Sequence, residues 1–324
     1  MEWHQQHRTA SISRALPVHH SGRRVHADQE DGTAEVDLPF LQHQAPHSWG
    51  FLFMGGWVDL GKKIIMKKLL LILIVLISVF SCRPIAKFNT LIKGSGSPTI
   101  VFESGLGTLL SNWDEIQTSI SANYKTISYD RKGLGESQAT DIPRTIENLV
   151  KDLDSLISQN KINGPIILVG HSLGGHIVRK YQQSFPSKVA GLFLIDPTNE
   201  YLYDEVFKQM SQGAADSMRT AWDNSYKKVS IGVFNEWKEA YKIDTIMRQC
   251  PLPTNIPITI LASYQESKFL TKKNAQIKKK LFSDWKKDKK NIKILNTTNS
   301  GHYIHFGEPE WVITELEAYL KSLK

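Results

Sequence analysis

The stretch Gly170-His171-Ser172-Leu173-Gly174-Gly175 lies between an apolar run, Pro165 to Val169, and an amphipathic run from Leu173 to Phe185. This order predicts a buried strand, a sharp turn and a helix, which is the context that a G-x-S-x-G motif needs to present a nucleophilic serine. The turn is so tight that the residues two positions before and two positions after the serine must be small, and both, Gly170 and Gly174, are glycine. We therefore expect the Ser172 hydroxyl above the strand end, with the Leu173 N–H at the start of the helix facing a developing oxyanion.

Short apolar segments separated by helical patterns continue through the chain after residue 87. The segments with the composition of strands are 88–93, 99–103, 124–129, 166–169, 189–195, 258–262 and 292–295. Amphipathic spacing predicts helices between them, for example over 145–158. This alternation predicts an α/β fold with a mostly parallel central sheet and helices on both faces.

The interval 197–255 has no strand pattern but contains many aromatic and charged residues in a mainly helical pattern. Helices inserted after a strand would cover the strand ends, where a lid commonly controls access to a site. We predict a helical cap over about 197–255. The alternative is a solvated helical excursion far from the site.

Four segments together resemble the α/β-hydrolase fold family over about Phe88 to Lys324. They are Glu103-Ser104-Gly105-Leu106-Gly107, Asp130-Arg131-Lys132-Gly133-Leu134-Gly135-Glu136-Ser137, the serine turn, and Ser300-Gly301-His302-Tyr303. The resemblance implies an α/β-hydrolase fold with the cap inserted after the sixth strand, and the chain order nucleophile, acid, histidine. It thereby implies Ser172 as nucleophile, His302 as base, and the backbone N–H groups of Leu106 and Leu173 as the oxyanion hole.

Two carboxylates are candidates for the acid of the triad. The resemblance places the acid most commonly just past the strand 258–262, where the available carboxylate is Glu266. Some members of the family use the end of the preceding strand instead, where Asp196 stands before Pro197. We favour Asp196, because it sits on a rigid strand end. Glu266 is the alternative, and it ranks lower because it must reach the histidine from a loop. Asp130 matches a structural position that holds its own turn.

The resemblance implies a serine hydrolase that cleaves carboxylic esters of small to medium acyl groups through an acyl-enzyme, as a carboxylesterase or lipase-like enzyme does. The expected partner is a small-molecule ester or acyl substrate, with no cofactor and no metal. A peptidase, a lactonase or a C–C bond hydrolase of the same fold is an alternative, and so is a binding or sensor protein that has lost turnover. We find no nucleic-acid module and no Cys/His metal spacing in the sequence.

The first part of the chain differs in composition from the rest. Residues 1–61 hold seven of the eleven histidines and no lysine, whereas lysine is abundant from Lys62 onward. Met66-Lys67-Lys68, the apolar run 69–80 and Ser81-Cys82 have the order of a secretory signal peptide, and its end resembles a bacterial lipobox. The apolar run is too short to span a bilayer, which takes about 20 residues. We predict a non-native upstream leader or disordered segment over 1–65, a signal peptide over 66–82 and one domain over 83–324.

This interpretation places the protein in a bacterial cell envelope, exported and anchored to the membrane by a lipid on Cys82. The alternatives are a genuine cytosolic extension with a signal anchor, and a conventional cleavage site beside an ordinary cysteine. If Cys82 is acylated, Cys250 is the one remaining cysteine. The domain then contains no internal disulfide, and we expect Cys250 to be buried as a small hydrophobic residue.

The domain has an excess of positive charge. Beyond Cys82 there are 32 Lys and Arg against 25 Asp and Glu, and eleven of the lysines lie in 268–293. We interpret that segment as a solvated, lysine-rich helix. The alternative is a basic flank that presses on anionic lipid near the anchor.

Overall fold

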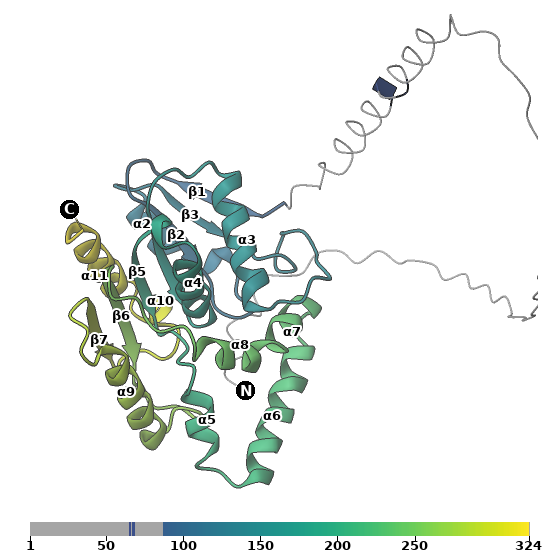
Figure 1. Cartoon of the computed structure of the whole chain (residues 1–324). Helices are drawn as coiled ribbons and strands as arrows, with labels where there is room; N and C mark the ends of the chain where they lie inside the picture. The colour runs from purple at the N-terminus through teal and green to yellow at the C-terminus, as the bar shows by residue number, and fades with distance from the viewer. Residues whose placement is uncertain (1–64, 66, 69–86, 324) are drawn as a thin grey trace, which may run out of the picture. The chain divides into compact units, whose positions relative to one another are not determined.

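The computed structural model describes residues 65, 67, 68 and 87–323 (Figure 1). The chain divides into two units between Ser81 and Cys82, and only the second is described over most of its length. In the first unit, Ile65, Lys67 and Lys68 are helical. The described residues include only Ile65 of the predicted leader over 1–65. They include only Lys67 and Lys68 of the predicted signal peptide, and the lipobox lies outside them.

A seven-stranded sheet forms the centre of the second unit, in the order β1-β3-β2-β4-β5-β6-β7. All neighbouring strands are parallel except the edge pair β1 and β3, which is antiparallel. The predicted α/β fold with a mostly parallel sheet is therefore confirmed. The strands are β1 (Thr90–Lys93), β2 (Thr99–Glu103), β3 (Thr126–Tyr129), β4 (Ile166–His171), β5 (Val189–Ile195), β6 (Ile258–Ser263) and β7 (Ile292–Thr297).

Helices cover both faces of the sheet, so its central strands are apolar throughout rather than alternating. Successive side chains of β4 point to opposite faces. Leu168 joins a core with α3 (Ile146–Gln159), α4 (Leu173–Ser184) and α9 (Lys272–Lys286). Val169 joins a second core on the other face. The helices of that second core are α2 (Asp114–Ile120), α10 (Ile304–Gly307) and α11 (Pro309–Lys321). Two short 3-10 helices complete the unit: η2 (Leu110–Trp113) precedes α2, and η3 (Pro186–Lys188) lies between α4 and β5.

Four helices and no strand lie between β5 and β6, in the interval 197–255 where we predicted the cap. The insertion follows β5, which is the fifth strand of the described residues and not the sixth. Figure 1 shows the four helices together at the lower side of the view. They are α5 (Leu202–Phe207), α6 (Gln212–Lys227), α7 (Ile231–Trp237) and α8 (Ala240–Met247).

Aromatic side chains hold the cap helices together. Seven rings contact one another with centroid separations between 4.3 and 6.5 Å. Each such ring buries a large apolar surface, and edge-to-face or offset pairs add further stabilisation. The members of this aromatic cluster are Tyr203, Phe207, Trp222, Tyr226, Trp237, Tyr241 and Phe269.

The lysine-rich segment forms α9, and most of its lysines are exposed, as expected. Lys278 is different, because it is buried together with Phe282 and Trp285 on the inner side of the helix. Cys250 is buried as a free thiol, which confirms the expectation for it. None of the helices in residues 65, 67, 68 and 87–323 is long and apolar enough to cross a membrane.

Candidate active site

Ser172 stands at the turn between β4 and α4 with a strained backbone. Its φ of +52° and ψ of −119° are unfavourable for a residue with a side chain, and such outliers persist where the surrounding structure enforces them. A Cβ on Gly174 would lie 2.3 Å from the carbonyl oxygen of Glu103, and one on Gly170 would lie 2.8 Å from that of Gly174. Both positions therefore have to be glycine, in agreement with the prediction from the motif.

The structure brings Ser172, His302 and Asp196 together in one hydrogen-bonded row. His302 Nε2 is 2.9 Å from Ser172 Oγ, and His302 Nδ1 is 2.7 Å from Asp196 Oδ2. A carboxylate only accepts hydrogen bonds, so Nδ1 carries the proton and Nε2 is left to accept one from the serine hydroxyl. Asp196 directly follows β5, whereas Glu266 is exposed in the loop after β6. Asp196, the favoured candidate, is thus the carboxylate that contacts the imidazole.

The second oxygen of Asp196 is held by two further donors. Oδ1 accepts a hydrogen bond from the Ser263 N–H at 2.8 Å and from Lys278 Nζ at 2.6 Å. Burial acts to raise the pKa of the Asp196 carboxyl, but the charge of Lys278 and the hydrogen bond from His302 outweigh it and hold the pKa below its usual value. Asp196 is therefore ionised at neutral pH although it is buried.

The end of β6 supports the site without supplying the acid. Ser263 occupies the strand end beyond which the resemblance most commonly places that acid. Its N–H donates to Asp196, and its hydroxyl donates to the carbonyl oxygen of Ser300 at 2.6 Å. Ser263 thereby links the aspartate to the loop that carries His302.

Glu308 fixes the same loop from its other side. Its carboxylate accepts hydrogen bonds from the hydroxyls of Thr297, at 2.7 Å, and of Ser300. Burial acts to raise the pKa of Glu308, but these hydroxyl donors outweigh it and lower the pKa. Hydrogen bonds from Ser263 and to Glu308 thus hold the loop between β7 and α10, which carries His302.

Two more histidines pack next to His302. His171 Nε2 lies 3.0 Å from the carbonyl oxygen of His302, and the ring of His305 stacks on Trp113. Burial lowers the pKa of His171 well below its usual value and that of His305 to about 3. Both rings are therefore neutral at pH 7 and act by packing. In the part of the chain that the structure describes, no group of three His, Cys, Asp or Glu residues could hold a metal ion.

The loop after β2 contains Leu106, one of the two predicted oxyanion donors. A Cβ on the neighbouring Gly105 would lie 3.4 Å from the Cβ of Ser172, so this loop runs beside the serine. The Gly105 carbonyl oxygen accepts hydrogen bonds from Arg131 Nη2 at 2.6 Å and from the Thr108 hydroxyl at 2.9 Å. In a trans peptide the C=O and the following N–H point in opposite directions, so fixing this carbonyl also fixes the Leu106 N–H.

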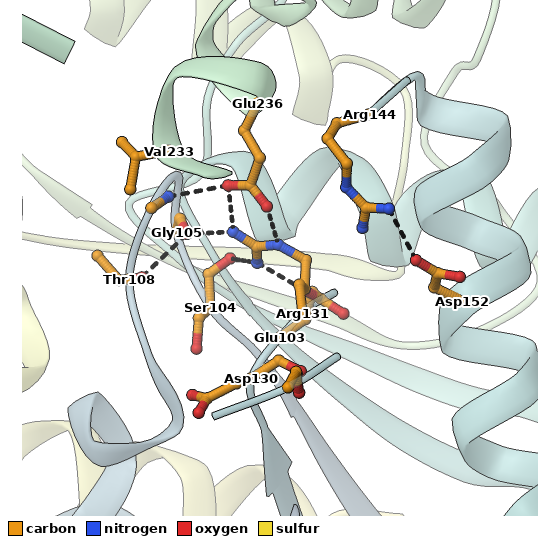
Figure 2. A network of polar contacts seen from close by, with 12 residues as sticks. Glu103, Ser104, Gly105, Thr108, Asp130, Arg131, Arg144, Asp152, Val233 and Glu236 are labelled. Carbon is orange, nitrogen blue, oxygen red and sulfur yellow. Dashed lines mark hydrogen bonds and ion pairs between the residues drawn. The ribbon is translucent and has the colours of Figure 1, made fainter. Parts of the chain in front are cut away.

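A buried charge network holds that loop (Figure 2). Arg131 Nη1 pairs with Glu103 at 2.8 Å, and its Nε pairs with Glu236 of the cap helix α7 at 2.6 Å. Burial alone would lower the pKa of Arg131, but Glu236 and Glu103 raise it, so the guanidinium stays charged. The second oxygen of Glu236 accepts the Gly107 N–H at 2.9 Å. The Gly107 N–H therefore already donates a hydrogen bond within the protein.

Three residues that hold the site in place were not predicted from the sequence. Lys278 was included in a solvated helix, although its spacing of four and seven residues from Phe282 and Trp285 places it on an apolar helix face. Glu308 lies directly before the last helix, and no motif in the sequence marked it as a residue that holds the His302 loop. For Glu236 no sequence signal was available, since its partner Gly107 is 129 residues away.

Comparison with known proteins identifies the family of this chain. The sequence matches the family model described as alpha/beta hydrolase fold over residues 98–311. This match covers more than half of the chain, and the protein therefore belongs to the α/β-hydrolase fold family. The uncharacterized protein YqjL of Bacillus subtilis (strain 168) is 27% identical over 227 residues, which cover 68% of this chain and 82% of YqjL.

Solved structures share the fold at low sequence identity. An esterase from Thermogutta terrifontis has a TM-score of 0.53 at 16% identity, over 74% of this chain and 94% of that one. An epoxide hydrolase from Vigna radiata has a TM-score of 0.55 at 14% identity, over 74% of this chain and 98% of that one. At such identities the likeness concerns the fold alone.

Proposed function

We propose that this protein is a serine hydrolase that cleaves carboxylic ester bonds through an acyl-enzyme. The observation that carries the proposal is the hydrogen-bonded row from Asp196 through His302 to Ser172, which ends on a serine in a strained turn. Each side chain has the partner that its part in acyl transfer requires. Ser172 is partly exposed, so a substrate can reach its hydroxyl.

The reaction begins when Ser172 Oγ attacks the ester carbonyl and gives its proton to His302 Nε2. Asp196 accepts the Nδ1–H and stabilises the imidazolium that forms. The imidazolium then protonates the departing alcohol as the tetrahedral intermediate collapses to the acyl-enzyme. A water molecule, deprotonated by His302, then attacks the acyl carbonyl. As the second tetrahedral intermediate collapses, the imidazolium gives this proton to Ser172 Oγ, the acid is released and Ser172 and His302 return to their starting states.

The negative charge of the tetrahedral intermediate falls on the former carbonyl oxygen. The Leu173 N–H lies at the N-terminus of α4, where the helix dipole favours negative charge. The Leu106 N–H belongs to the peptide that Arg131 and Thr108 orient. We assign these two groups to the oxyanion hole, where loss of one donor costs about 3 to 4 kcal/mol in other enzymes.

The aromatic side chains of the cap are an argument for a substrate with an apolar acyl or alcohol part. Burial and the neighbouring tyrosine Tyr226 raise the pKa of both Tyr203 in the cap and Tyr303 beside His302. Asp196 adds to this effect on Tyr203, which is a member of the aromatic cluster. Apolar and aromatic linings are typical of small-molecule sites. The aromatic content of the cap therefore favours an ester with an apolar acyl or alcohol part.

The shared fold alone would also accommodate other chemistry, since an esterase and an epoxide hydrolase both resemble it. Epoxide hydrolase chemistry on this fold needs an aspartate nucleophile, and position 172 is serine. A peptidase, a lactonase and a C–C bond hydrolase would use the same three side chains. The choice of ester substrates is therefore what the first experiment has to test.

The test is hydrolysis of p-nitrophenyl esters from acetate to palmitate by the full chain, with Ser172→Ala as the blank. We expect turnover that disappears in the variant, together with labelling of the native protein by a fluorophosphonate. Labelling without ester turnover would move the assignment to one of the other acyl-transfer reactions. A folded protein that neither labels nor turns over would contradict the proposal and favour a binding protein.

A further inference from the structure

A buried lysine contacts the aspartate of the proposed triad. Lys278 Nζ lies 2.6 Å from Asp196 Oδ1 and 2.9 Å from the carbonyl oxygen of Ser263. The Lys278 side chain is only 6% exposed. A lysine is rarely buried to this extent unless its charge is paired, because removing an ammonium group from water is costly. Here the partner is the carboxylate that also holds His302.

We propose that Lys278 is a positioning residue of the triad, which orients the Asp196 carboxylate and keeps the Asp196–His302 pair free of an additional proton at neutral and mildly acidic pH. The proposal rests on the serine hydrolase function proposed above.

The geometry assigns different tasks to the two oxygens of Asp196. Oδ1 receives both Lys278 Nζ and the Ser263 N–H, whereas Oδ2 receives His302 Nδ1. Two donors on one oxygen fix the rotation of the carboxylate plane, so that the other oxygen faces the imidazole. Lys278 also bonds the carbonyl oxygen of Ser263 and so joins the ends of β5 and β6 to α9.

The charge of Lys278 has a second effect. The Asp196 carboxylate attracts a proton to the imidazole, and a cation on the far side of the carboxylate weakens this attraction. Without the cation, the buried carboxylate and the imidazole together would retain an additional proton at higher pH. An imidazole that already carries this proton cannot accept the one from Ser172, so the acidic limb of the activity profile would move upward.

Glu308, which holds the loop that carries His302, is ionised at pH 7, because the effect of burial on its pKa is outweighed by hydroxyl donors that lower it. The tyrosines and histidines that face the pair are neutral at pH 7. Burial raises the pKa of Tyr264 to about 12, and burial also raises the pKa of Tyr203 and of Tyr303. Burial lowers the pKa of His171 and of His305. These groups face the pair from α5, β4, α10 and the loops after β6 and β7. Lys278 is therefore the cation that sets the charge balance of Asp196 and His302 in the described part of the chain.

The test compares Lys278→Met with Lys279→Met in the full chain. Both variants remove one positive charge from neighbouring positions of α9, but Lys279 is exposed. We expect Lys278→Met to move the acidic limb of the kcat/KM profile upward by about one pH unit, and Lys279→Met to leave it in place. Lys278→Arg, which keeps the charge, should restore the limb even if the maximal rate falls.

Three further outcomes decide the question. If the acidic limb does not move in Lys278→Met, or if the rate falls equally at every pH, the proposal is overturned. Lys278 would then only stabilise the local structure and would not influence the protonation of Asp196 and His302. If Lys278→Met does not fold, Lys278→Gln supplies a second neutral variant that can still donate to Asp196. If neither neutral variant folds while Lys278→Arg does, Lys278 serves the fold and the proposal is rejected.

The failure of this proposal can be distinguished from failure of the proposed function. A native protein that is neither labelled by a fluorophosphonate nor active on esters contradicts the serine hydrolase. A native protein that is active, with the same acidic limb in all the Lys278 variants, contradicts only the assignment of Lys278. The pH dependence of the fluorophosphonate labelling rate gives a second measurement that is free of substrate effects.

Discussion

The carboxylate of Glu236 in the cap helix α7 accepts a hydrogen bond from the backbone N–H of Gly107, in the loop beside Ser172. The same helix approaches this loop closely at a second point, where a Cβ on Gly107 would lie 2.8 Å from the side chain of Val233. A Cβ on Gly232 would lie 1.9 Å from the carbonyl oxygen of Gly133. Helix α7 is therefore docked on two loops of the hydrolase body, and moving it would break buried ionic contacts.

We expect Glu236→Gln to lower kcat about 10- to 100-fold while KM changes little. The glutamine loses the charge that pairs with Arg131, so the Gly105 carbonyl and the Leu106 N–H are held less firmly. Steady-state kinetics on a short p-nitrophenyl ester measure the effect. Glu239→Gln is the matched control, since Glu239 lies beyond the end of the same helix and pairs with the exposed Lys242. An unchanged kcat in Glu236→Gln would show that the cap does not act on the oxyanion loop.

The identity of the acid can be tested by two neutral replacements. Asp196→Asn should lower kcat by about four orders of magnitude, because the amide cannot stabilise the imidazolium and favours the wrong tautomer. Glu266→Gln should change kcat little, since Glu266 is exposed. Thermal unfolding of both variants checks that Asp196→Asn remains folded although Lys278 has lost its charged partner. The opposite pattern of rates would make Glu266 the acid.

The Arg179–Glu200 pair should make stability depend on pH. Burial acts to raise the pKa of Glu200, but Arg179, 2.9 Å away, outweighs it and holds the pKa below its usual value of 4.5. A carboxyl whose pKa is lowered on folding stabilises the fold above its unfolded pKa, and this contribution is lost as the pH falls through the folded pKa. Glu200→Gln should therefore lose about 3 kcal/mol of unfolding free energy at pH 7, and less at pH 3.

Urea unfolding at pH 7, 5 and 3 measures this difference. Glu205→Gln is the control, because Glu205 pairs with Lys208 on the surface, where such pairs contribute less than about 1 kcal/mol. A loss in Glu200→Gln that is equal at pH 7 and pH 3 would mean that the charge of Glu200 does not stabilise the fold.

Export and lipid attachment remain predictions from the sequence. Expression of the full chain in a bacterial host with labelled palmitate should give a labelled protein in the membrane fraction. Cys82→Ser should remove the label, since the thiol is the acceptor. A labelled Cys82→Ser variant would place the lipid elsewhere, and an unlabelled native protein would reject the lipobox.

The local part of the site could be predicted from the sequence because it depends on short-range physics. The apolar run before Ser172, the small residues on both sides of it and the amphipathic run after it specify a strand, a turn and a helix within about 20 residues. His302 lies in a polar loop after the last strand, but its part as the base was implied by the resemblance to the family and not by this local pattern. Alternation of strands and helices similarly predicted the parallel sheet, and the lack of a strand pattern over 197–255 predicted the helical cap.

The acid could only be ranked from the sequence. Asp196 and Glu266 both follow strands that are neighbours in the parallel sheet, so their loops emerge at the same edge. In the structure Asp196 contacts both His302 and Lys278, whereas Glu266 is exposed. Which carboxylate an imidazole meets depends on distances of a few ångströms, and a sequence pattern does not specify such distances.

By itself, the sequence determined the fold class, the serine turn and the histidine loop, since neighbouring residues encode each of them. Only the tertiary structure decided that Asp196 contacts His302, that Lys278 is buried against Asp196, and that Glu236 holds the Gly107 loop. The partners in these three contacts are between 82 and 129 residues apart. Contacts of that range arise when the sheet and its helices pack, because burial makes each charged group require a partner.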